Sequence, residues 1–216
     1  MSQRIVLIHA TPLAVAPVND TFAQQWPDAQ IANLLDDALS GDRGKVAALT
    51  PELYQRIDAL VDYAVSMHAA AILFTCSALG EAIDASAGRH ALPILKPNEA
   101  MFEAALEQGN NIVMLATFAP AVPGMEAEFQ QLAALKGSDA RVTTQLVAGA
   151  RDALSRGEVE LHNQLVTAAA RQVQQADAII LAHFSMEVAF REITAAVSCP
   201  VLSSAQSAVA KLKRVM

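Results

Sequence analysis

The chain alternates short apolar runs with longer segments in which apolar residues recur every three or four positions. Runs of the first kind are typical of strands buried on both faces of a parallel sheet, and segments of the second kind are typical of amphipathic helices. In one such helical segment Ile57, Val61 and Ala64 share a face, and Thr50 followed by Pro51 predicts where that helix begins. The alternation of strand and helix predicts an α/β fold.

Several apolar runs repeat at one constant offset in the numbering, 107 (112 minus 5), which indicates an internal duplication. The duplication predicts two pseudo-symmetric halves, each a four-stranded parallel sheet flanked by helices, with an active-site cleft between them. We expect the first half to comprise residues 1–97 together with a C-terminal helix at 205–216, and the second half residues 98–204. The repeated segments are 5–8 with 112–115, 72–74 with 179–181, 93–95 with 200–202 and, after a small gap, 29–34 with 140–145.

Composition and charge narrow the class of protein. The 216 residues are 53% hydrophobic and 17% charged, which excludes a disordered chain. The net charge of -7 and the lack of a basic cluster argue against nucleic acid or an anionic membrane as partner. No apolar stretch has the roughly 20 residues that span a bilayer. The two cysteines are too few for a disulfide framework, so we expect reduced thiols and a cytoplasmic protein.

Two reactive side chains fall at equivalent positions of the repeat. Ligands of open parallel α/β sheets bind beyond the carboxyl ends of the strands. Cys76 directly follows one apolar run, and the same offset, 107 (183 minus 76), places it on His183. A thiol facing an imidazole suits proton transfer from both faces of a small substrate. The structural alternative is a buried free cysteine and a hydrogen-bonded core histidine.

Hydroxyl side chains accompany this pair at the strand ends. With the neighbouring backbone amides and helix N-termini, they could bind a carboxylate without any arginine. Each hydroxyl taken alone could equally be a helix N-cap. We expect substrate binding by His9, Thr11, Thr75, Ser77, Thr117 and Ser185.

Other candidate residues point away from a site. Asp36 and Asp37 are adjacent, so at most one can face the cleft, and a solvated loop pair is the favoured interpretation. Cys199 precedes Pro200 at the start of a strand, away from the cleft, and is interpreted as structural. The histidines lack the spacing of a metal site, so we expect no metal. Glycine-rich phosphate-binding loops are absent from the sequence as well.

The residues at these strand ends resemble a known family. Ile-Leu-Phe-Thr-Cys-Ser at 72–77, Ala116-Thr117 after the fifth strand and the duplicated halves are similar to the aspartate/glutamate racemase superfamily. That superfamily includes hydantoin racemases, maleate isomerase and arylmalonate decarboxylase. The resemblance implies a cysteine enzyme that uses no metal or cofactor and moves a proton at the carbon next to a carboxylate or acyl group. We expect a small carboxylate as substrate and a homo-oligomer.

The sequence also departs from the family. Racemases of this superfamily carry a second cysteine where His183 stands, and the decarboxylase carries its one cysteine in the second half. The leading hypothesis is a racemase or isomerase in which Cys76 acts as a thiolate of lowered pKa and His183 as the complementary acid. In a second hypothesis Cys76 is the nucleophile of an isomerase, decarboxylase or hydrolase. In a third, the chain binds a small ligand without catalysis.

Overall fold

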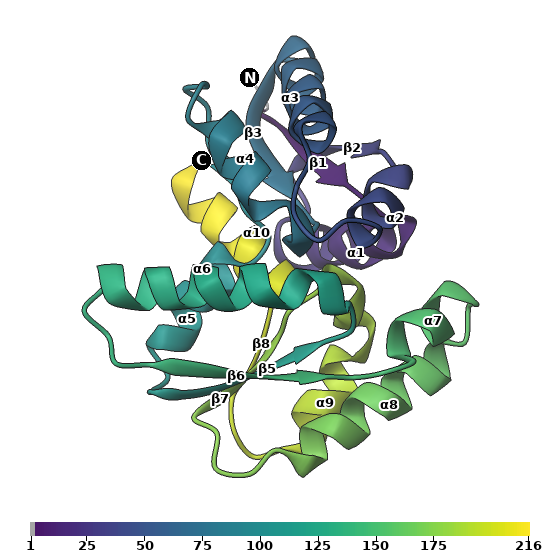
Figure 1. The fold of residues 1–216 in the computed structure, drawn as a ribbon, viewed down its shortest axis with the longest axis vertical. Coiled ribbons are helices and arrows are strands. Elements are labelled where there is room, and N and C mark those ends of the chain that lie inside the picture. The colour runs from purple at the N-terminus through teal and green to yellow at the C-terminus, as the bar shows by residue number, and fades with distance from the viewer. Residues whose placement is uncertain (1–2) are drawn as a thin grey trace.

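The computed structural model describes residues 3–216, which form two four-stranded parallel sheets flanked by helices (Figure 1). The predicted fold class is confirmed. The strand order is β2-β1-β3-β4 in the first sheet and β6-β5-β7-β8 in the second, so the two sheets repeat one topology. The strands are β1 Arg4–His9, β2 Gln30–Leu35, β3 Ala69–Phe74, β4 Ile94–Leu95, β5 Asn111–Ala116, β6 Arg141–Leu146, β7 Ala178–Leu181 and β8 Val201–Ser203.

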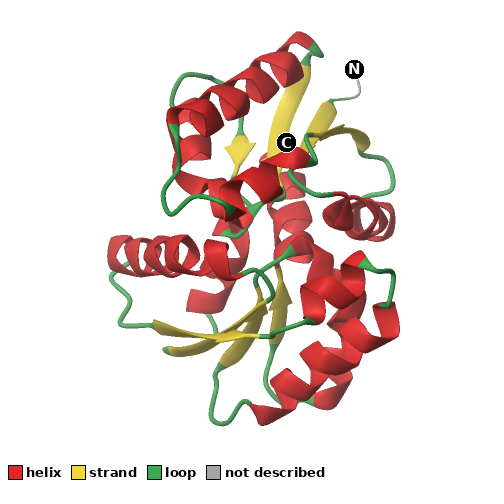
Figure 2. Cartoon of the chain, turned by 45° about the vertical axis from the view of Figure 1, so that its right-hand side comes forward, coloured by secondary structure: helices red, strands yellow, loops and turns green. Residues whose placement is uncertain are grey.

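Helices cover both sheets (Figure 2). A short 3₁₀ turn follows each of the strands β1, β3, β5 and β7. The helices are α1 Val15–Gln25, α2 Ala38–Gly44, α3 Pro51–Ser66, α4 Gly80–Ala87, α5 Glu99–Leu106, α6 Val122–Leu135, α7 Ala150–Ser155, α8 Val159–Gln172, α9 Phe190–Ala196 and α10 Ser204–Val215. The 3₁₀ turns are η1 Pro12–Ala14, η2 Ser77–Leu79, η3 Ala119–Ala121 and η4 Phe184–Ala189.

The duplication predicted from the sequence is visible in the strand boundaries. Strand β1 begins at Arg4 and β5 at Asn111, so these two starts differ by the offset of the repeat (111 minus 4). The edge strands β2 and β6 begin at Gln30 and Arg141, and here the offset is larger by four (141 minus 30), which is the gap inferred from the sequence. Equivalent strands therefore end at equivalent places, and the residues after them face one another.

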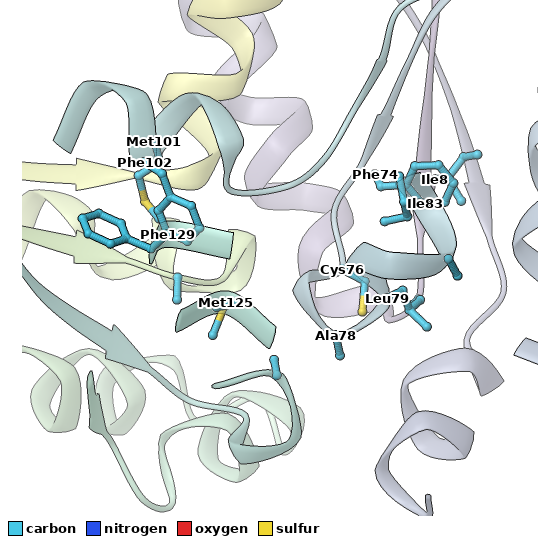
Figure 3. Packing of buried hydrophobic residues seen from close by; sticks show 14 of the residues in the cluster. Ile8, Phe74, Cys76, Ala78, Leu79, Ile83, Met101, Phe102, Met125 and Phe129 are labelled. Carbon is cyan, nitrogen blue, oxygen red and sulfur yellow. The ribbon is translucent and has the colours of Figure 1, made fainter. Parts of the chain in front are cut away.

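The two halves share part of their hydrophobic core. One cluster joins Ile8 and Phe74 of the first half to Met101, Phe102 and Phe129 of the second (Figure 3). Burial of a large apolar side chain is worth roughly 1.5–3 kcal/mol, so this shared cluster opposes separation of the halves.

The C-terminal helix α10, yellow in Figure 1, packs against the first sheet. Its Ala205 and Val209 belong to one cluster with Ile5 and Leu7 of β1. The chain thus crosses back to its first half at the end. The assignment of residues 1–97 with 205–216 to one half and 98–204 to the other stays a prediction.

Candidate active site

The strand ends of the two sheets meet at a small cavity. Cys76 follows β3 and His183 follows β7, and both line the same cavity of about 40 Å³. The geometry expected from the repeat, a thiol and an imidazole on the walls of one pocket, is therefore present. Further lining residues are Thr11, Leu13, Ala14, Ser40, Thr75, Ser77, Ala78, Thr117, Phe118, Ala121, Arg151, Phe184 and Ser185.

Cys76 lies both at the cavity and in the shared core. Its side chain is 8% exposed and packs in the cluster that joins the two halves, beside Ala78 and Leu79 (Figure 3). Burial raises the pKa of the Cys76 thiol, and a hydrogen bond with the Ala78 backbone and the charges of Arg151 and Arg43 only oppose this rise. The expected thiolate of lowered pKa is wrong for this structure, because desolvation outweighs the nearby positive charges. Cys76 rests as a protonated thiol.

His183 is held by the second half of the chain. The Phe118 backbone N–H donates to its Nε2 at 3.2 Å. Burial lowers the pKa of His183 to about 4, and the positive charge of Arg151 acts in the same direction. The expectation that His183 is the complementary acid is therefore wrong for the resting protein, because an acid at this position would have to be an imidazolium near neutral pH. Because Nε2 accepts a hydrogen bond, the neutral ring carries its proton on Nδ1.

Arg151 supplies a cation that the sequence reasoning missed. It lies in the first turn of α7, its Nη2 donates to Ser40 Oγ at 2.9 Å, and its guanidinium stacks over the Phe118 ring at 4.3 Å from the centroid. These contacts hold it in the cavity wall near Cys76 and His183. A carboxylate can thus be met by an arginine, contrary to the expectation of hydroxyls and amides alone. The available signal was its place just after β6, at the carboxyl-end edge of the second sheet, where His183 also lies after β7.

His9 lies behind the cavity wall rather than in it. Its side chain is fully buried, with Nδ1 at 2.9 Å from Thr75 Oγ1 and Nε2 at 2.8 Å from Asn33 Oδ1. Burial lowers the pKa of His9, so the ring is neutral. Nε2–H then donates to Asn33, and the Thr75 hydroxyl donates to Nδ1. Thr75 lines the cavity, but its proton is directed away from it.

The remaining predicted hydroxyls divide into engaged and available groups. Ser77 Oγ donates to the Ala182 carbonyl at 3.0 Å, so its proton is already used. Thr11 Oγ1 accepts the Leu13 N–H at 3.4 Å and caps η1. Among the hydrogen bonds found for residues 3–216, none involves the hydroxyls of Thr117 or Ser185, and both line the cavity. These two are free to bind a ligand.

The acidic pair and the second cysteine lie away from the cavity. Asp36 pairs with Arg56 at 2.6 Å, and neither Asp36 nor Asp37 lines the cavity. Cys199 precedes β8, at the opposite end of the second sheet, where it packs against the second half's own core.

Two further features bear on the class of protein. Within residues 3–216 no group of three or more His, Cys, Asp or Glu side chains is arranged to hold a metal ion. Over the same residues, no helix combines the length and apolar character needed to cross a membrane.

Comparisons with known proteins identify the fold. Sequence comparison finds no matching family model and no matching curated protein. Among solved structures, aspartate racemase of Picrophilus torridus is similar with a TM-score of 0.75 at 13% identity, covering 99% of this chain and 94% of that one. Glutamate racemase RacE1 of Bacillus anthracis gives 0.73 at 13% identity, with coverage of 99% and 81%.

A liganded double mutant of arylmalonate decarboxylase is also similar, with a TM-score of 0.66 at 18% identity and coverage of 98% and 92%. The predicted resemblance to the aspartate/glutamate racemase superfamily is confirmed at the level of the fold. At these identities it establishes the fold, which nearly the whole chain shares with these enzymes.

Proposed function

We propose that this protein is a cofactor-independent enzyme that moves a proton at the carbon next to a carboxylate of a small substrate. The observation that carries the proposal is the placement of the Cys76 thiol and the neutral His183 ring on one cavity, with Arg151 in its wall. The fold shared with racemases and a decarboxylase supports the same class of reaction.

In the proposed reaction Arg151 and the hydroxyls of Thr117 and Ser185 bind the substrate carboxylate. His183 Nε2 takes the α-proton from one face, and the electrons of the broken C–H bond pass into an enediolate. The Cys76 thiol then gives its proton to the same carbon from the other face, leaving a thiolate and an imidazolium. The guanidinium stabilises the negative charge that develops on the carboxylate oxygens.

His183 must release the Phe118 N–H before Nε2 can accept the proton. An ordinary hydrogen bond has a net value of about 0.5–1.5 kcal/mol, so this exchange is accessible. The freed amide is then a donor for an enediolate oxygen. The Phe118 N–H thus occupies His183 Nε2 before the reaction. During the reaction the same N–H would stabilise the negative charge that develops on the enediolate oxygen.

The size of the cavity limits the substrate and requires movement. A volume of about 40 Å³ holds about three water molecules at roughly 10–15 Å³ each, which is less than a small carboxylic acid needs. Two contacts between the halves would separate on opening: Arg151 to Ser40, and Arg43 Nη2 to the Pro120 carbonyl at 3.4 Å. In this proposal the halves open to admit a small substrate and then close around it.

Decarboxylation is the second candidate, and one specific observation favours it. Cys76 rests protonated while the ring nitrogen of His183 is occupied by Phe118. Protonation of an enediolate left by loss of carbon dioxide needs one acid and no base. Cys76 alone would then carry the chemistry.

Deuterium incorporation separates these possibilities. The protein is incubated in D2O with amino acids, hydantoins and 2-substituted malonates, and the α-carbon is followed by NMR. Racemisation predicts deuterium at the α-carbon of the inverted enantiomer, and both Cys76→Ser and His183→Gln should abolish this exchange with inversion. Decarboxylation predicts deuterium in the product of a malonate, with His183→Gln retaining activity.

The other outcomes count against the proposal. No deuterium in any substrate class, together with a thermal shift by a small carboxylate, would indicate a ligand-binding protein. A substrate-derived mass on Cys76 would indicate covalent catalysis. A homo-oligomer and a cytoplasmic location stay predictions.

A further inference from the structure

A buried hydrogen bond ties the loop of Cys76 to the loop of His183. Ser77 directly follows Cys76, and its Oγ donates to the carbonyl of Ala182, which directly precedes His183. The bond is 3.0 Å long and crosses from the first half to the second. Its geometry therefore bears directly on how far apart the thiol and the imidazole lie.

Asn98 fixes this bond from outside the cavity. The side chain is fully buried in the segment that connects β4 to α5, and it does not line the cavity. Its Nδ2 donates to Ser77 Oγ at 3.0 Å, and its Oδ1 accepts from Ser204 Oγ at 2.8 Å. Ser204 Oγ also lies 2.9 Å from the carbonyl of Leu181, the last residue of β7. One amide thus connects the segments beside both strand ends.

The direction of the Ser77 hydroxyl depends on Asn98. A hydroxyl has one proton, and because Ser77 Oγ accepts from Asn98 Nδ2, that proton is directed to the Ala182 carbonyl. Without the donor, the Ser77 side chain can occupy its other staggered rotamers. Buried networks whose members are all satisfied hold one arrangement, because an unpaired polar group inside a protein is costly.

We propose that Asn98 is a positioning residue of this enzyme, setting the separation of Cys76 and His183 through Ser77 and Ser204. This inference rests on the proposed function for its kinetic consequence, although the placement of the thiol can be measured without it. The residue at the equivalent place of the second half is Ala205, so the repeat contains no second copy of this amide.

Asn163 offers a matched control. Its side chain is 7% exposed, and its Nδ2 donates to Glu192 Oε1 at 2.7 Å and to the Val188 carbonyl at 3.4 Å. It lies on α8 and does not line the cavity. Its partners, Val188 in η4 and Glu192 in α9, do not line the cavity either, so Asn163→Ala removes a comparable buried amide that contacts neither Ser77 nor Ser204.

The experiment uses the full chain with Cys199→Ser, so that Cys76 is the remaining thiol. Asn98→Ala, Asn98→Asp, Ser204→Ala and Asn163→Ala are compared. Asn98→Asp keeps an acceptor for Ser204 but has no donor for Ser77. The readouts are the thermal midpoint, the pH profile of Cys76 alkylation by iodoacetamide, and kcat and KM separately.

We expect Asn98→Ala and Asn98→Asp to change the alkylation profile and to lower kcat by about 10- to 100-fold with little change in KM, since misplacement by about 1 Å can cost on the order of 100-fold. Ser204→Ala should act in the same direction and be weaker, and it serves if the Asn98 variants do not fold. Asn163→Ala should shift only the thermal midpoint.

An alkylation profile unchanged in the Asn98 variants, or in Ser204→Ala if those do not fold, would overturn the inference. The same holds if Asn163→Ala changes the profile equally. If the parent protein shows no turnover at all, the proposed function fails, while the alkylation measurements still decide the role of Asn98.

Discussion

The loops of Cys76 and His183 occupy equivalent places in the two halves, yet they hold their side chains in opposite ways. At the first loop the neighbours Thr75 and Ser77 are hydrogen-bonded and the thiol faces the cavity. At the second loop the imidazole itself is bonded, by the Phe118 amide. The repeated backbone therefore carries a protonated thiol, Cys76, in the first half. In the second half it carries a neutral imidazole, His183, whose Nε2 already accepts a hydrogen bond.

The charge near the cavity is also unequal. Arg151 follows β6, and the equivalent position after β2, aligned through the starts of these two strands, is Ser40. The two side chains meet across the pseudo-symmetry as donor and acceptor. Because one guanidinium acts on both groups, it lowers the pKa of the thiol and of the imidazole together. The symmetry of the fold thus does not extend to the electrostatics of the site.

Loss of the proposed proton donor, Cys76, should have the largest effect. Cys76→Ser replaces the thiol by a far weaker acid, so turnover should fall by about 10²- to 10⁴-fold, the usual contribution of a general acid or base. Because Cys76 is part of the shared core, burying a hydroxyl there should also cost about 1–3 kcal/mol of stability. Deuterium incorporation and urea denaturation measure the two effects. Full activity in Cys76→Ser would remove the first loop from the mechanism.

The occupied imidazole predicts a pH dependence of stability. The pKa of His183 is about 4 in the folded protein against about 6.5 when unfolded. Below about pH 6.5 the unfolded chain binds a proton that the folded chain does not, so stability falls as the pH drops toward 4. Through His183 the free energy of unfolding should fall by about 3 kcal/mol in total, at roughly 1.36 kcal/mol per unit of pKa difference.

His183→Gln isolates this contribution, because its amide oxygen can still accept the Phe118 N–H. Burial also lowers the pKa of His9 and His162, so the variant keeps part of the acid dependence. Urea denaturation between about pH 7 and pH 4 should therefore show the parent losing more stability than the variant. Parallel curves would mean that the folded protein does not hold His183 as the neutral base described above.

Removal of the shared cation tests whether one charge governs both loops. Arg151→Met should lower kcat/KM by about 10- to 100-fold, since hydrogen bonds to charged groups contribute about 1.5–3 kcal/mol. The pKa of His183 and that of Cys76 should both rise, because a nearby positive charge lowers each of them now. Both limbs of the pH profile should move to higher pH. Arg151→Lys keeps the charge and should leave the limbs in place, and limbs that move apart in Arg151→Met would contradict a common cation.

The sequence was sufficient for the fold and for the pairing of Cys76 with His183, because both follow from apolar runs that repeat at a fixed distance. Burial and hydrogen bonding were not available from it. The protonation of Cys76 depends on how closely the halves pack, and that of His183 depends on one amide, Phe118, from another loop. Arg151 was not predicted because it follows the edge strand β6, which aligns with β2 only after a gap in the repeat.

The smallest effect is expected at the other cysteine, Cys199, which belongs to the half that carries His183. Cys199 packs against the core of the second half at the sheet end away from the cavity. Cys199→Ser should leave kcat and KM unchanged and alter stability by about 1 kcal/mol or less, because the side chain is only partly buried at the border of this core. Iodoacetamide should then inactivate the single-thiol protein in step with modification of Cys76. Loss of activity in Cys199→Ser would instead show that a second thiol takes part, and the contrast between a thiol loop and an imidazole loop would no longer describe the site.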